Sequence, residues 1–267
     1  MRRKLTRPAM VAAAFLALPV AAWSDEGIST DRPDFVESSS VVGAHRFQIE
    51  TGFSSERDKS AGLKTTTRTT PTLLRIGMND TLEFRIETDG ATRVTTEDQA
   101  LGTKLTERGY SDVSFGMKWH MRDGDEEKGT PAIAWLAHLD VDTGSPAFRG
   151  QGLRPSLRMV AEWELPQDFS VGVMPGFVAD RNEDGKRFVG GILAVTLGKG
   201  WGDKWHTFVE IAGQQLASKS NGGSVVTFDA GATYLLTKSA QLDVSISRGL
   251  TSYTPDLQWG VGLSLRF

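Results

Sequence analysis

The chain has 267 residues, a formal net charge of −3, 29 glycines and no cysteine. Charge this close to balance excludes the strongly basic face of a nucleic-acid-binding protein. No nucleic-acid partner is therefore expected. The lack of cysteine excludes disulfides, thiolate catalysis and cysteine-based zinc sites.

Residues 1–24 have the organisation of a secretory signal peptide. A basic start that includes Arg2 and Lys4 precedes an apolar run over 8–22, and the small residues Ala22 and Ser24 lie before a cleavage point at Asp25. The run is roughly 15 residues long, short of the ~20 that span a bilayer, which disfavours a membrane anchor. Because no later run approaches that length, we expect an exported protein rather than a helical membrane protein.

The segment 25–45 follows the signal peptide and precedes the first strand. Its charges are dense: Asp31, Arg32, Asp34 and Glu37. Such a segment can fold into the periplasmic mouth of a pore and pair with charges there, as a plug. A solvated leader is the equal alternative.

From residue 46 the chain alternates apolar and polar residues at period two, the pattern of strands with one apolar face. The clear strands are expected at 47–53, 82–87, 113–121, 133–141, 157–164, 242–247 and 257–267, and weaker ones at 66–78, 169–180, 187–198, 205–217 and 224–236. About twelve strands of roughly ten residues suit a transmembrane antiparallel up-and-down β-barrel over 46–267. A soluble sandwich shares the alternation, but a closed sheet satisfies its backbone in lipid.

The connections differ in length on the two sides of the predicted barrel. Short turns are expected at 79–80, 166–168 and 237–239, and longer loops at 55–65, 91–109 and 143–152. Short turns face the periplasm in such barrels and longer loops face outward. The segment 123–128 departs from this rule as a longer periplasmic turn.

The last strand ends on an aromatic residue. Leu257, Trp259, Val261 and Leu263 share its apolar face, and the chain ends at Phe267. A terminal phenylalanine closing such a strand resembles the sorting signal of outer-membrane barrel proteins. Outer-membrane lipid and the outer-membrane assembly machinery are the partners that this implies.

The opposite strand faces would line the lumen with charges of both signs. The members are Arg46, Glu50, Arg75, Glu83, Arg85, Glu87, Lys118, His120, His138, Asp140, Arg158, Glu162, Glu164, His206, Glu210, Asp229, Asp243, Arg248 and Arg266. In a barrel of about twelve strands they would nearly meet, either sealing the pore or leaving a narrow path through a paired network. The residues expected to set the pore field and gating are Glu83, Arg85, Glu87, Lys118, Arg158 and Glu162.

One stretch of the mature N-terminus resembles a known family. Thr30-Asp-Arg-Pro-Asp34, Glu37-Ser and then Gln48-x-Glu-x-Gly-Phe53 are similar to the family of the MetA-pathway of phenol degradation. Members of that family are usually called outer-membrane transporters. The resemblance implies an exported barrel that passes aromatic or other apolar compounds.

The sequence has only weak matches to catalytic and metal-binding motifs, so we expect no enzyme, no catalytic residue, no cofactor and no metal site. Asp142-Thr-Gly-Ser145 matches the aspartic-protease motif only once, and the acidic stretches 123–127 and 140–142 are typical of solvated turns. The four histidines lack metal-ligand spacing. We predict an outer-membrane channel or transporter for a small molecule not identified by the sequence. The alternatives are a structural or adhesive barrel without transport, and a barrel acyl hydrolase, which the inward direction of His120, His138 and His206 disfavours.

Overall fold

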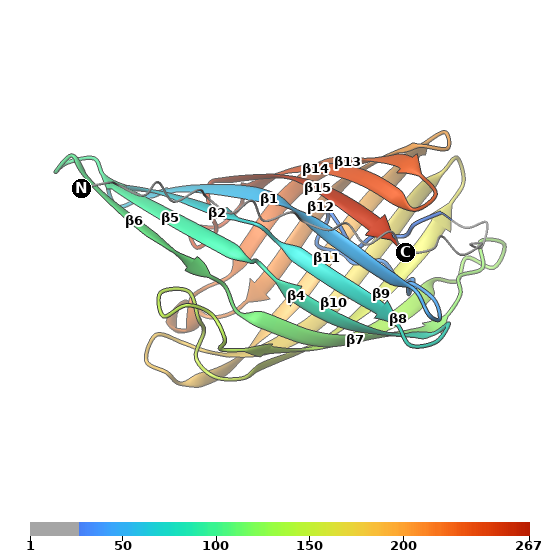
Figure 1. Cartoon of the computed structure of the whole chain (residues 1–267), viewed down its shortest axis with the longest axis horizontal. Helices are drawn as coiled ribbons and strands as arrows, with labels where there is room; N and C mark the ends of the chain where they lie inside the picture. Colours follow the sequence, from blue (N-terminus) through green and yellow to red (C-terminus); the bar gives the residue numbers. More distant parts are fainter. Residues whose placement is uncertain (1–26) are drawn as a thin grey trace, which may run out of the picture.

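The strands form one continuous antiparallel sheet that closes on itself (Figure 1). The computed structural model describes residues 27–267; the predicted signal peptide and its cleavage point lie outside them. The strands are β1 Phe47–Ser60, β2 Leu63–Thr69, β3 Thr72–Gly77, β4 Leu82–Thr88, β5 Ala91–Asp98, β6 Thr103–Tyr110, β7 Val113–Arg122, β8 Ala132–Val141, β9 Arg154–Leu165, β10 Phe169–Arg181, β11 Arg187–Trp201, β12 Trp205–Leu216, β13 Val225–Thr237, β14 Ala240–Gly249 and β15 Leu257–Arg266.

These segments make a barrel wall of twelve strands, which confirms the predicted fold. β2 and β3 are two parts of one strand, since both pair with β1 in the same register across Thr70–Pro71. β4 and β5 are likewise consecutive, as are β6 and β7. β1 closes the barrel by pairing with β15 from Gln48 opposite Arg266 to Arg57 opposite Leu257.

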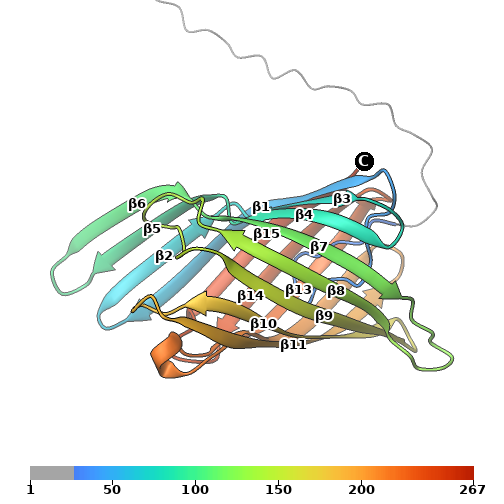
Figure 2. The same ribbon diagram turned by 90° about the horizontal axis from the view of Figure 1, so that it is seen from below.

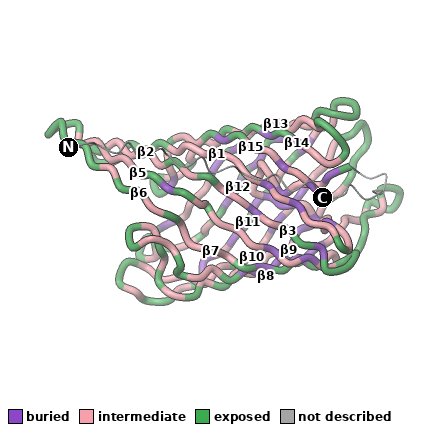
Figure 3. Tube along the Cα trace, viewed as in Figure 1, coloured by how far each residue is buried: buried purple, intermediate pink, exposed green. Residues whose placement is uncertain are grey.

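The two faces of the wall differ in the way that period-two alternation predicts. On β7, Phe115, Met117 and Trp119 are 42–49% exposed on the outside, whereas Lys118 between them is fully buried inside. An exposed apolar belt around a closed sheet is the surface that a hydrocarbon environment requires. The buried residues gather inside the barrel, at the end where the segment before β1 lies (Figure 3).

Four strand segments extend beyond one end of the barrel (Figures 1 and 2). They are the second half of β1, then β2, β5 and β6, paired in that order. We call this sheet the extension. The predicted loops 55–65 and 91–109 are therefore wrong: apart from the tight turns at 61–62 and 99–102, both stretches are strands. Threonine and charged residues replace the apolar residues here, so the hydrophobic alternation vanishes although threonine favours strands.

The connections place the extension on the outer side of the membrane. At the end that holds Phe267, turns such as 166–168 and 202–204 are short; at the other end lie the long loops 142–153 and 217–224. Short turns are the periplasmic ones in barrels of this kind. The one helical turn among residues 27–267 is η1, Lys219–Asn221, and no helix in that range is long and apolar enough to cross a membrane.

Candidate pore and lumen segment

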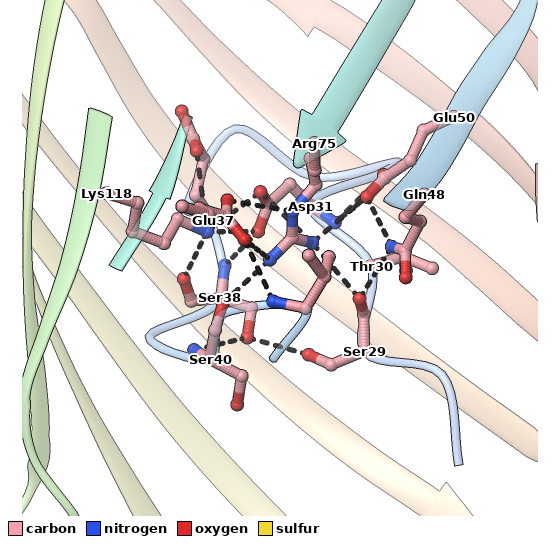
Figure 4. Close-up of polar contacts among 12 residues, drawn as sticks. Ser29, Thr30, Asp31, Glu37, Ser38, Ser40, Gln48, Glu50, Arg75 and Lys118 are labelled. Carbon is pink, nitrogen blue, oxygen red and sulfur yellow. Dashed lines mark hydrogen bonds and ion pairs between the residues drawn. The ribbon is translucent and has the colours of Figure 1, made fainter. Parts of the chain in front are cut away.

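Residues 27–46, which we call the lumen segment, lie inside the barrel before β1 (Figure 4). Asp31 is its most heavily paired residue. Lys118 Nζ donates to the two carboxylate oxygens at 2.7 and 2.8 Å, and Arg85 Nη1 donates to Oδ2 at 2.5 Å. Arg75 Nη1 is 3.3 Å from Oδ2. All four side chains are at most 2% exposed, so charge pairing offsets the desolvation of each.

Backbone amides hold the same turn against the wall. Glu50 on β1 accepts from the N–H groups of Asp31 at 2.9 Å and Arg32 at 3.1 Å. Arg75 and Gln48 also donate to this carboxylate, at 3.1 and 2.8 Å. Glu50 thereby satisfies two donors of a segment that has no secondary structure of its own.

The second anchor of the lumen segment is Glu37. Its carboxylate pairs with Arg85 Nη2 at 2.6 Å and with Arg158 Nη1 at 3.1 Å. Arg85 therefore bridges Asp31 and Glu37, while Arg158 also stands over the ring of Phe35 at 5.5 Å.

Contacts on the opposite wall complete the attachment. Glu210 on β12 accepts from the N–H groups of Phe35 at 2.8 Å and Val36 at 2.7 Å. Arg32 Nη2 meets Asp243 on β14 at 3.1 Å. Carboxylates on the wall accept two further amides of the segment: Ser39 N to Glu162 at 2.6 Å and Val42 N to Glu83 at 3.0 Å.

Val36 adds an apolar contact to these polar ones. It packs in a buried cluster with Leu136, Val160, Met174, Ala194 and Ala212. Gly172 leaves the space: a Cβ there would lie 2.8 Å from Val36 Cγ1. The lumen segment therefore fits this wall by shape as well as by charge.

Cavities remain on both sides of the lumen segment. Towards the extension lie cavities of about 160 Å³, beside Pro33 and Glu87, and about 530 Å³, beside Glu87 and His138. Towards the periplasmic turns lie cavities of about 250 Å³, beside Asp34 and His206, and about 550 Å³, at Asp80 and His120.

The structure brings most of the predicted lumen residues to the segment. Glu83, Arg85 and Lys118 are buried in its network, and Arg158 and Glu162 contact it. Glu87 lines the outer cavities instead, with His138 Nε2 at 3.9 Å. The inward direction of these side chains follows the predicted alternation; their roles in pore field and gating stay a prediction.

Of the four charged residues expected in a plug, three are paired with the wall. These are Asp31, Arg32 and Glu37. The fourth, Asp34, lines the two cavities whose volumes are about 160 and 250 Å³. Gln48 and Val36 were not expected at the site. Gln48 has the inward parity of Glu50, but no sequence pattern marks Val36 as the residue that enters the apolar cluster. Within residues 27–267, no group of three or more acidic or histidine side chains is placed to hold a metal ion.

The model of the family described as "Putative MetA-pathway of phenol degradation" matches residues 30–267, nearly the whole of the described chain. The chain belongs to this family. The predicted resemblance is thus confirmed, and the match begins at Thr30, next to the residue that Lys118 binds. Curated protein sequences give no match.

Solved structures with the same fold are outer-membrane barrels. An outer membrane channel from Pseudomonas putida F1 superposes with a TM-score of 0.59 at 13% identity, covering 88% of this chain and 99% of that one. The KdgM porin gives a TM-score of 0.51 at 11% identity, covering 82% and 99%. At these identities the similarity shows the fold alone.

Proposed function

We propose that the chain, exported and freed of residues 1–24, is an outer-membrane channel whose narrow path for small molecules is controlled by the lumen segment. The observation that carries this proposal is the position of residues 27–46 between cavities that open towards opposite ends of the barrel. A molecule crossing the lumen must pass this segment. The exposed apolar belt supports a site in lipid.

Charge supports a gate rather than a catalytic centre. Arg85 and Lys118 face Asp31 and Glu37 in the buried part of the lumen, where each sign meets its opposite. Paired charges of both signs give little preference for cations or anions. His120, His138 and His206 point into the barrel, away from the lipid face that an acyl hydrolase would use.

For substrate, we propose small aromatic molecules that carry a polar group. The family description names phenol degradation. On this chain, the cavity of about 160 Å³ is lined by Pro33, Phe35, Pro71 and Leu73 beside Arg85 and Glu87. Such a lining suits a ring on one side and a hydroxyl or carboxylate on the other.

The test is conductance of the refolded mature protein in planar lipid bilayers, with a panel of salts and small phenols. Discrete steps with weak ion selectivity, transiently blocked by phenols, are expected. Insertion without any step, together with no phenol uptake into proteoliposomes, would contradict the channel and favour a structural barrel. Steps without phenol block would contradict the substrate class alone.

A further inference from the structure

The extension carries opposite charges on its two faces. Arg57, Lys59, Lys64, Arg68, Arg93, Lys104 and Arg108 share the outer face with one acid, Glu97. On the inner face, above the barrel mouth, the charged residues are all acids: Glu56, Asp58, Asp98 and Glu107. Because the whole chain has a net charge of −3, this concentration of cations on one face is local.

Three arginines on the outer face stand side by side. The register pairs Arg68 with Arg93 and Arg93 with Arg108, so one row across three strands holds three guanidinium groups. Neighbouring strands are about 4.8 Å apart, and like charges directly opposite each other destabilise a sheet. Within residues 27–267 none of the three guanidinium groups has a hydrogen-bond or ion-pair partner.

In a parallel row on the same face, an acid compensates the charge of neighbouring lysines. Lys64, Glu97 and Lys104 lie in register, and Glu97 accepts from Lys64 at 3.0 Å and from Lys104 at 2.8 Å. In the row between them, Thr66, Thr95 and Thr106 follow Arg57 of β1. The sheet thus supplies an acid to the row that contains Lys64 and Lys104, which Lys59 of β1 extends, and supplies none to the arginine row.

The arginine row adjoins the lipid-facing belt. Arg68 is opposite Ser55, and Ser55 is opposite Trp259 on β15. Trp259 packs against Phe53, and Tyr110 at the base of β6 is 67% exposed on the same face. Aromatic residues of this kind mark the membrane interface in barrels. The arginines therefore lie just outside that interface, at the level of headgroups in the outer leaflet.

We propose that the row Arg68–Arg93–Arg108 binds the phosphate groups of lipid A, the anchor of lipopolysaccharide in the outer leaflet. Arginine suits phosphate because its planar fork donates two hydrogen bonds to neighbouring oxygens. An anion shared by adjacent guanidinium groups would also remove their mutual repulsion. This site faces lipid, whereas the proposed channel lies inside the barrel, so each can fail without the other.

The test is lipid A binding to the folded mature chain in nonionic detergent, measured by native mass spectrometry in buffer with EDTA. The variant is Arg93→Glu, which places an acid between two cations, as Glu97 lies between Lys64 and Lys104. We expect at least about tenfold weaker binding, since each basic residue near an anionic lipid contributes roughly that order. The thermal midpoint without lipid should not fall, because repulsion is replaced by attraction.

Matched controls separate this site from general charge effects. Arg187→Glu makes the same charge change at the outer end of β11 and should bind lipid A like the unaltered chain. Fully dephosphorylated lipid A should bind weakly, and with the same affinity, to all variants. Equal binding of lipid A by Arg93→Glu and the unaltered chain would overturn the proposal. If inorganic phosphate displaced lipid A when both were present at equal concentration, the assignment of the arginine row to a lipid would be overturned.

Discussion

Lys118 Nζ reaches the two carboxylate oxygens of Asp31 at 2.7 and 2.8 Å, although 87 residues separate them in the chain. The contact ties the lumen segment to β7. Because Asp31 also meets Arg75 and Arg85, this one carboxylate contacts three buried cations, which Glu37, Glu50 and Glu83 help to neutralise. Asp31 therefore joins the lumen segment to β3, β4 and β7 at once.

Replacing Asp31 by Asn should loosen the lumen segment and enlarge the pore. Loss of the charge leaves three buried cations short of a partner, which disfavours docking by about 3 kcal/mol, or roughly a hundredfold in the docking equilibrium. Single-channel recordings should show larger or noisier conductance steps. Asp34→Asn is the control, because that side chain lines cavities instead of pairing with Arg75, Arg85 or Lys118. Identical recordings from both variants would show that Asp31 does not gate.

How far the sequence predicts this arrangement differs between wall and segment. Alternation alone places Glu83, Arg85 and Lys118 inside, because period two is a local property of a strand. It cannot place Asp31 against Lys118, since residues 27–46 lack secondary structure and their path is set by contacts with distant strands. The extension escaped prediction for another reason: around Thr65 and Thr95 both faces are polar, so no hydrophobic pattern reveals the strand.

Asp112 accepts hydrogen bonds from the outer loop 142–153, so the stability of this loop should depend on pH. It lies between β6 and β7, level with the start of the outer loop, and accepts from Gly144 N at 2.8 Å, Gly150 N at 2.7 Å and Arg154 Nη2 at 2.7 Å. Burial raises the pKa of Asp112, but the hydrogen bonds from Gly150, Arg154 and Gly144 outweigh it and hold that pKa below its ordinary value of 3.8.

Because the pKa of Asp112 is lowered in the folded chain, the loop loses stability at acid pH. The carboxylate stabilises the closed loop above the unfolded pKa of 3.8, and this contribution is lost as the pH falls through the lower folded pKa. Hydrogen exchange at Gly144 and Gly150, corrected for intrinsic rates, should therefore be slow at pH 7 and faster only below about pH 4. Asp112→Asn should show the fast exchange already at pH 7. Asp140→Asn serves as the control, because the Asp140 carboxylate lies 3.8 Å from the same Arg154 whereas the amides of Gly144 and Gly150 donate to Asp112. Equal effects of the two variants would contradict the role of Asp112.

Leu263 tests the direction of the last strand. It lies on the outer face of β15, opposite Thr51 and Leu242. Leu263→Arg should impair assembly, because arginine at the middle of a bilayer costs about 2–4 kcal/mol in a barrel. Thr95→Arg puts the same residue on the outer face of the extension, outside the lipid belt, and should assemble normally. Comparable heat-modifiable folded fractions for both variants would place Leu263 outside the lipid.

Phe267 can act through sorting or through packing, and Phe47 separates the two. The rings stack at 4.8 Å between centroids, and the two residues exchange backbone hydrogen bonds of 2.8 and 3.1 Å at the seam of the barrel. Deleting Phe267 should lower the amount in the outer membrane more than total expression. Phe47→Leu removes the stack but keeps the terminal aromatic, so its outer-membrane level should stay near normal if the terminus is recognised during assembly. Equal losses in fractionated membranes would instead assign the whole effect to closure of β1 against β15, because only the packing contact is common to the two variants.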